Sequence, residues 1–238
     1  PVATMELKTD TTQSIEHAIR QYKNDRAPID GKTRLPEPLL SFGKRALVHF
    51  AVSTDEVRMT THLEGANTRF LPFNRGLPDG HGGAGAGNPV DTQNGYATTY
   101  LWKEVLEPNN WMAVMGKFLA THVSEVKNAK GKAEIKKTLL FPRYHQWDAV
   151  TRLVRATLAD KVGKSYLVQH SAGSGKSNTI GWLAHRLAVL HDAQDCKVFN
   201  SVIVITDRKV LDSQLQDTIA QFTNQDGAVA NVTRGSAQ

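Results

Sequence analysis

The segment SYLVQHSAGSGKS at residues 165–177 carries the residue types of a phosphate-binding loop. Gly173 and Gly175 permit backbone conformations in which successive N–H groups converge on an anion, and a helix beginning near Lys176 would add the positive end of its dipole. The ammonium of Lys176 would reach the β- and γ-phosphates of a nucleotide, and the hydroxyl of Ser177 would ligate a bridging Mg²⁺. The residues expected to bind the nucleotide phosphates are Gly173, Ser174, Gly175, Lys176 and Ser177.

The residues around this loop follow the order that a nucleotide-binding loop requires. Residues 166–168 read as a strand before the loop, and apolar residues recur on one helical face after it. The strict pattern G-x-x-x-x-G-K-[ST] has glycine where this chain has His170, and that departure weakens the pattern by itself. An ordinary glycine turn between a strand and a helix is the alternative. The apolar helical face consists of Ile180, Leu183, Ala184, Leu187 and Leu190.

A carboxylate and an ammonium share one face of the strand expected at residues 2–8. The two-residue period of a strand sends Glu6 and Lys8 to one side and Met5 and Leu7 to the other. This arrangement suits a metal-dependent nuclease, with Glu6 as a Mg²⁺ ligand and Lys8 beside an attacking water or a scissile phosphate. The pattern E-x-K fixes only two residues, so a solvated strand end is the alternative.

An amphipathic helix is expected after this strand, because Ser14 can cap it and apolar residues recur at helical spacing from Ile15 to Tyr22. Its other face includes Arg20, Gln21 and Lys23, which suits a helix lying along DNA phosphates. A solvated helix face explains the same residues equally simply.

The rest of the chain reads as a succession of short elements. The pattern predicts strands at 46–52 and 56–63, a flexible or ligand-wrapping glycine-rich loop at 74–95, helices at 98–107 and 111–126, an exposed linker at 127–137, a helix over 150–158, a buried parallel strand at 201–206 and a helix over 211–222. The linker holds five lysines and one glutamate, so it is either solvated or follows a phosphate backbone. The βαβα order near the end predicts a three-layer lobe with a parallel sheet.

Composition indicates a globular protein with a polyanionic partner. The formal charge is +6 over 238 residues, and the sequence pI is near 9.4. No run of about 18 apolar residues is present, which argues against a membrane span. The single Cys196 and the lack of a secretory signal favour a cytoplasmic protein. The start at Pro1 without methionine suggests part of a longer protein.

Several segments together carry a resemblance to a known family. They are MELKTDTTQSIEHAIRQYKNDRAP, ALVHFAVSTDEVRMTTHL, FLPFNRG with GNP, YLWKEVL, FPRYHQWDAV, LVQHSAGSGKS and VIVITDRKVLDSQL, and they follow one another along nearly the whole chain. In this succession the chain resembles the restriction subunit of type I restriction-modification enzymes. That subunit fuses an endonuclease to a superfamily 2 ATPase that translocates DNA.

The resemblance implies an α/β chain in three parts. Residues 1–73 would be the C-terminal part of a PD-(D/E)xK-type nuclease domain, 74–138 a connector with a glycine-rich loop, helices and a basic linker, and 139–238 the N-terminal part of a P-loop helicase lobe with a parallel sheet. The implied enzyme is an ATP-dependent type I site-specific deoxyribonuclease. The partner aspartate of the nuclease would precede Pro1, and the carboxylate pair of the ATPase would follow Gln238. These residues alone are therefore expected to bind nucleotide weakly and to turn over little or none.

The resemblance also assigns individual residues. Glu6 and Lys8 match the end of the nuclease motif, and Gln146 matches a glutamine that reads adenine ahead of the ATP site. The nuclease's Q-x-x-x-Y motif does not align cleanly, so Gln21 and Tyr22 are DNA-binding candidates only. The resemblance places one further pair, Asp207 and Arg208, in a helicase segment near DNA.

The implied cofactors are ATP and Mg²⁺, with S-adenosylmethionine needed only by the assembled complex. The implied partners are double-stranded DNA and the methyltransferase and specificity subunits of the same complex. Two other readings stay open. One is a small-molecule kinase that uses Lys176 and holds Mg²⁺ through Asp207. The other is a non-catalytic nucleic-acid-binding or assembly module with a degenerate nucleotide site.

Overall fold

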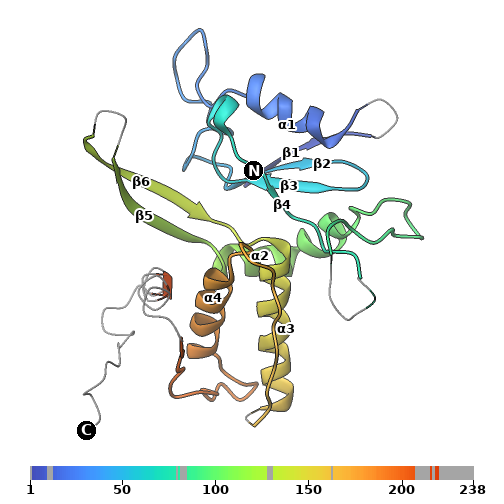
Figure 1. Ribbon diagram of the computed structural model, residues 1–238, viewed down its shortest axis with the longest axis vertical. Helices are drawn as coiled ribbons and strands as arrows, with labels where there is room; N and C mark the ends of the chain where they lie inside the picture. Colours follow the sequence, from blue (N-terminus) through green and yellow to red (C-terminus); the bar gives the residue numbers. More distant parts are fainter. Residues whose placement is uncertain are drawn as a thin grey trace. The chain divides into compact units, whose positions relative to one another are not determined.

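The computed structural model describes residues 2–9, 13–78, 80, 85–127, 131–161, 163–206, 215, 218 and 219 (Figure 1). The chain divides into two compact units, Pro1–His145 and Gln146–Gln238. Within the described residues, no helix has the length and apolar character needed to cross a membrane. The three-part domain division expected from the sequence stays a prediction.

Unit 1 is built on a four-stranded sheet. Its strands are β1 (Ala3–Leu7), β2 (Val48–Val52), β3 (Val57–Thr60) and β4 (Leu71–Pro72), and they lie in that order. β1 pairs with β2 in parallel, and the other two pairs are antiparallel. The first three strands confirm the strands predicted at 2–8, 46–52 and 56–63, each with shorter ends.

Helix α1 (Ile15–Asn24) connects to β1 and covers one face of the sheet (Figure 1). Its apolar face packs Ile15, Ala18 and Ile19 against Ala51 of β2. Ser14 is the N-cap residue, as predicted, and its backbone N–H donates to His17 Nδ1 at 3.0 Å. The helix therefore confirms the amphipathic pattern read from the sequence.

Strand β2 is the centre of unit 1, and all five of its residues are buried. Its second face contacts an aromatic cluster, in which the ring of Phe50 lies 5.4 Å from that of Phe73 and 6.2 Å from that of Phe141. Tyr144 extends the cluster, with its ring 6.0 Å from Phe73. Burial of these rings holds the sheet between α1 and the aromatic cluster.

The two ends of the glycine-rich loop are pinned to the β2–β3 hairpin. Asn88 Nδ2 donates to the carbonyl of Asp55 at 2.8 Å and to Asn74 Oδ1 at 2.9 Å, and Asn88 Oδ1 accepts from the backbone N–H of Arg75 at 2.7 Å. Asn74 Oδ1 also accepts from the backbone N–H of Val57 at 2.9 Å. The asparagines of FNRG and GNP therefore have a structural role, which the sequence pattern alone did not reveal.

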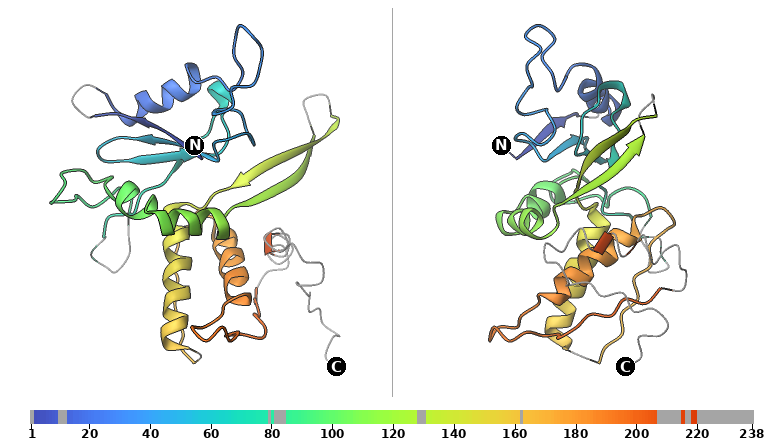
Figure 2. Two further views of the ribbon diagram at one scale, coloured as in Figure 1. Left: turned by 180° about the vertical axis from the view of Figure 1, so that it is seen from behind. Right: turned by 90° about the vertical axis from the view of Figure 1, so that its left-hand side faces the viewer.

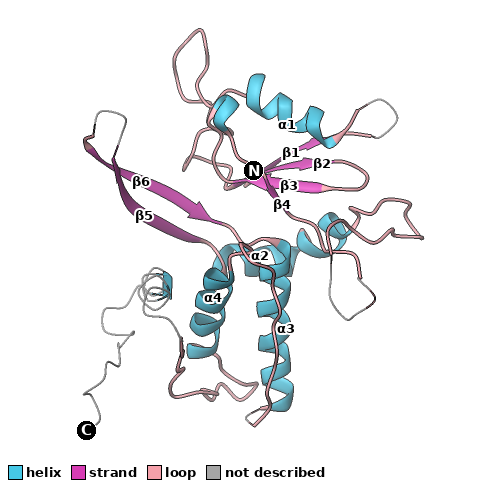
Figure 3. Cartoon of the chain, in the orientation of Figure 1, coloured by secondary structure: helices cyan, strands magenta, loops and turns pink. Residues whose placement is uncertain are grey.

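The middle of the chain differs from its prediction. The structure has a short 3-10 helix η1 (Gly65–Asn67), a π-helical turn η2 (Leu101–Val105), helix α2 (Pro108–Lys117) and the antiparallel strands β5 (Ala120–Lys127) and β6 (Ala133–Leu140) (Figure 3). The helix predicted to reach residue 126 ends at Lys117, and within the predicted linker at 127–137 the described residues 127 and 133–137 are strand. The predictions failed there because β5 and β6 stabilise each other through cross-strand hydrogen bonds, which no local pattern encodes.

Unit 2 contains two described helices, α3 (Tyr144–Asp160), which begins two residues before the unit boundary, and α4 (Lys176–Ala188). Val150 on α3 and Trp182 on α4 are almost completely buried. Both helices confirm the sequence pattern. Of the helix predicted at 211–222, only residues 215, 218 and 219 are described, and these three are helical.

The strands predicted at 166–168 and 201–206 are wrong for the described structure. Neither segment is assigned as strand in the described part of the chain, and the exposed fractions are 91% for Leu167, 81% for Ile203 and 88% for Ile205. The described part of unit 2 therefore lacks the parallel sheet expected from the βαβα order. A parallel strand is stable only when neighbouring strands satisfy its backbone groups, and these segments have none among the described residues.

Candidate nucleotide-binding loop and N-terminal charged cluster

The glycine loop before α4 has the backbone that its sequence demands. Gly175 is the N-cap residue of α4 with φ of 81°, and Gly173 has φ of 72°. Both values lie in the left-handed region, which side chains other than glycine rarely adopt. Lys176 and Ser177 are the first two residues of the helix, so the loop delivers them to its positive end.

His170 departs from the strict loop pattern without straining the backbone. The described non-glycine residues with positive φ are Arg34, Lys161 and Asp195, so His170 takes an ordinary conformation that needs no glycine. Its carbonyl accepts a hydrogen bond from Lys176 Nζ at 3.2 Å. The same ammonium donates to the carbonyl of Ser171 at 2.9 Å. Lys176 thus lies across its own loop, and phosphates would have to replace these two carbonyls as its partners.

Gln146 links the start of α3 to the glycine loop. Its side chain is buried, and Nε2 donates to the carbonyl of Ser174 at 3.2 Å and to that of Gly175 at 3.0 Å. A Cβ atom placed on Gly175 would lie 2.6 Å from Nε2, which is closer than any real contact. The amide expected to read adenine therefore bonds to the loop in this structure, and a side chain at 175 would be strained by φ and would require Gln146 to move.

The groups at this loop suit the binding of a nucleoside triphosphate with Mg²⁺. An exposed ammonium, a left-handed glycine turn and the first N–H groups of a thirteen-residue helix all suit an anion. Nothing lies within 4 Å of a Cβ built at Gly173, so the loop is open at that residue. Ser177, half-buried in the first turn, would hold Mg²⁺ through its hydroxyl, and the ion would neutralise charge on the phosphates.

In unit 1, Glu6 lies between two cations. Lys8 Nζ donates to Glu6 Oε1 at 3.0 Å, and Arg26 Nη2 donates to Glu6 Oε2 at 3.3 Å. The side chain of Lys8 is 7% exposed and that of Arg26 is 49% exposed, so Arg26 is the more accessible of the two cations. The sequence predicted the Glu6–Lys8 pair, because both residues follow the two-residue period of β1. Arg26 follows the end of α1 and had no signal in that pattern.

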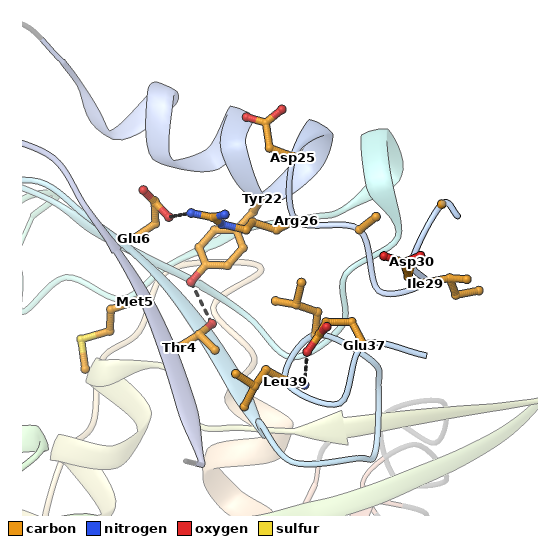
Figure 4. A pocket seen from close by; sticks show the side chains of 13 residues that line it. Thr4, Met5, Glu6, Tyr22, Asp25, Arg26, Ile29, Asp30, Glu37 and Leu39 are labelled. Carbon is orange, nitrogen blue, oxygen red and sulfur yellow. Dashed lines mark hydrogen bonds and ion pairs between the residues drawn. The ribbon is translucent and has the colours of Figure 1, made fainter. Parts of the chain in front are cut away.

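An open cavity of 560 Å³ lies beside this cluster, between β1, the end of α1 and the loop that follows it (Figure 4). Glu6 and Arg26 face each other at one end of the cavity. Carboxylates from Glu6, Asp25, Asp30 and Glu37 line it with the guanidinium. Hydrogen bonds from the backbone N–H and the hydroxyl of Thr33, and then from the backbone N–H of Lys32, hold the pKa of Asp30 below its usual range.

The described residues around Glu6 do not by themselves form a magnesium site. No group of three or more His, Cys, Asp or Glu side chains suited to a metal ion occurs among the described residues. Each oxygen of Glu6 already accepts from a cation, and a lone carboxylate leaves most positions around Mg²⁺ to water. Magnesium ligation by Glu6 therefore stays a prediction.

Thr4, on the same face of β1 as Glu6, joins a partly buried chain of polar side chains. Its Oγ1 lies 2.8 Å from Tyr22 Oη of α1 and 2.7 Å from His49 Nδ1 of β2. Burial raises the pKa of Tyr22 to about 12 and, with a smaller contribution from the charge of His62, lowers the pKa of His49 to about 4. Both side chains are thus neutral near pH 7, and they tie β1, β2 and α1 together.

The DNA-binding candidates on α1 differ in their exposure. Arg20 is exposed, whereas Gln21 is half-buried and Tyr22 is 2% exposed. Only Arg20 of the three is placed to reach a phosphate without a rearrangement. Asp207 and Arg208 lie outside the described residues.

One comparison with known proteins gave a match. Residues 145–236 match the family model described as the SWI2/SNF2 ATPase. No curated protein and no solved structure matched the chain. The matched segment begins beside Gln146 and includes the whole glycine loop and α4. This region is thus similar to the helicase-like ATPases, a similarity that supports an ATP-dependent nucleic-acid motor at a coarse level.

Proposed function

We propose that this chain is part of the motor and nuclease subunit of a type I restriction enzyme. Such a subunit hydrolyses ATP to translocate duplex DNA and cleaves the DNA with a metal-dependent nuclease. The observation that carries the proposal is the glycine loop, with left-handed Gly173 and Gly175 ahead of Lys176 at the start of α4. The match of residues 145–236 to a helicase-like ATPase favours this reading over a small-molecule kinase.

In the proposed site, each residue of the loop has a distinct role. Lys176 exchanges the carbonyls of His170 and Ser171 for phosphate oxygens. Its hydrogen bonds become stronger in that exchange, because the new acceptors are charged. Ser177 supplies its hydroxyl to the metal. Gln146 keeps the loop in the conformation that presents the N–H groups, through its bonds to the carbonyls of Ser174 and Gly175.

The nuclease part of the proposal rests on the Glu6–Lys8 pair. Lys8 carries a buried ammonium 3.0 Å from the carboxylate, so its geometry is fixed before a substrate arrives. A fixed cation of this kind stabilises the charge that develops on a phosphodiester during cleavage. Double-stranded DNA, the methyltransferase and specificity subunits, and S-adenosylmethionine in the assembled complex all belong to this proposal.

The thermal stability of the chain tests the nucleotide site. Mg²⁺ and ATP should raise the melting temperature, because a ligand that binds the folded state adds RT ln(1 + [L]/Kd), about 2.7 kcal/mol at a hundredfold excess over Kd. Differential scanning fluorimetry should show this rise in the wild type and not in Lys176→Ala.

Lys164→Ala is the matched control, because Lys164 is an exposed lysine in the same unit and lies before the loop. The control should keep the full rise in melting temperature. An unchanged melting temperature in the wild type would contradict ATP binding and would favour a non-catalytic module with a degenerate site.

A further inference from the structure

Strands β5 and β6 form a long two-stranded ribbon that extends from the rest of unit 1 (Figure 2). Eight residue pairs join the strands, from Ala120 opposite Leu140 to Lys127 opposite Ala133. One anchor lies at its base, where Thr61 Oγ1 donates to the carbonyl of Leu139 at 3.0 Å. Beyond the base its side chains are largely exposed, including 55% of Val123 and 69% of Ile135. An isolated ribbon of this kind is only marginally stable, which favours a bound partner.

The ribbon and the segment that joins its two strands are basic in sequence. Residues 120–140 contain five lysines and two glutamates, so their net charge of +3 is half of the formal +6 of the whole chain. Among the described residues, no carboxylate lies within ion-pair distance of Lys136 or Lys137. Both lysines are exposed. These two charges therefore remain available to a polyanion.

The register places the two lysines on opposite faces of the ribbon. Lys136 is opposite Ser124, and Lys137 is opposite Val123, and successive residues of a strand point to opposite sides. A protein partner that docks on one face would meet only one of these charges. A duplex presents phosphates along both walls of a groove, and the major groove of B-DNA admits a two-stranded ribbon. The arrangement of the charges favours nucleic acid.

The side chains of the ribbon also indicate how it would bind. Bidentate hydrogen bonds to base edges are made by Arg, Asn or Gln, or by a lysine that contacts guanine. The sequences of β5 and β6 contain no Arg, Asn or Gln. Lysine on flexible stems suits phosphate oxygens, which carry no sequence information. We propose that the β5–β6 ribbon is a sequence-independent contact for the phosphate backbone of duplex DNA, with Lys136 and Lys137 binding phosphates.

The test is the salt dependence of binding to a short fluorescent duplex, measured by anisotropy. Each phosphate contact contributes about 0.9 to the slope of log K against log salt concentration. Lys136→Ala with Lys137→Ala should lower the slope by about two and weaken binding roughly 60-fold near 0.1 M salt. Two duplexes of unrelated sequence should show the same losses.

The matched control is Lys32→Ala with Lys44→Ala, which removes the same charge from two exposed residues outside the ribbon. This pair should leave the slope nearly unchanged, and both variants should keep the wild-type melting temperature. Equal losses in the two variants would show a general charge effect and overturn the proposal. An unchanged slope in the ribbon variant would overturn it too, and neither result depends on whether the chain binds ATP.

Discussion

Gly175 is the residue at which three separate requirements meet. Its φ of 81° requires glycine, its position caps α4, and its missing Cβ leaves the space taken by the amide of Gln146. Gly173 shares the positive φ and has nothing within 4 Å of a Cβ. Substitutions at the two glycines therefore separate two effects. Backbone strain acts at both, and the loss of the Gln146 contact acts only at Gly175.

Gly175→Ala should reduce ATP affinity more than Gly173→Ala does. Both substitutions carry a conformational cost of about 1–2 kcal/mol for a side chain in the left-handed region. Gly175→Ala also displaces Gln146, whose Nε2 lies 2.6 Å from the new methyl. Titration with a fluorescent ATP analogue should show a difference of about tenfold or more.

Combining Gly175→Ala with Gln146→Ala should recover part of the affinity, because the clash is then removed. Equal affinities of the two glycine variants would mean that the contact with Gln146 does not hold the loop.

At the scale of elements, the sequence predicted best where one segment determines its own structure. Helices α1, α3 and α4 and strands β1 to β3 follow their periodic patterns, and Glu6 and Lys8 meet as the period of β1 requires. The β5–β6 ribbon was missed because its strands depend on each other. Arg26 and the contact of Gln146 with the glycine loop had no signal in the sequence for a similar reason, since their partners lie on other elements.

The Thr4–Tyr22–His49 chain, which joins β1, β2 and α1, makes the stability of the fold depend on pH. His49 has an ordinary pKa of 6.5 when exposed, and burial lowers its pKa to about 4 in the folded state. The unfolded state therefore binds more protons between these values. The contribution of His49 to the free energy of unfolding is fully present above pH 6.5. It is lost as the pH falls towards 4, which lowers the free energy of unfolding by up to about 3 kcal/mol.

Urea unfolding at several pH values should show this loss in the wild type and a smaller one in His49→Gln. His191→Gln is the matched control, because His191 is exposed, and it should retain the wild-type dependence. If the free energy of unfolding of His49→Gln depended on pH as that of the wild type does, His49 would not titrate in this way.

At the scale of the whole molecule, the two units carry different chemistry. Unit 1 has the Glu6–Lys8–Arg26 cluster and the basic ribbon, and unit 2 has the glycine loop. The expectation of a parallel sheet in unit 2 failed for the described residues, because a continuous apolar run predicts a buried strand without showing which strands cover it. The proposed nucleotide site does not depend on that sheet, since its residues lie on the loop and α4.

The most direct test of the account compares ATP with adenosine in equilibrium binding to this chain. In the proposed site the glycine loop contacts phosphates, so ATP should bind at least tenfold more tightly than adenosine, and Lys176→Ala should abolish most of that difference. Lys164→Ala should preserve it. Equal binding of ATP and adenosine by the wild type, or no binding of either, would contradict the assignment of residues 173–177 as a triphosphate site.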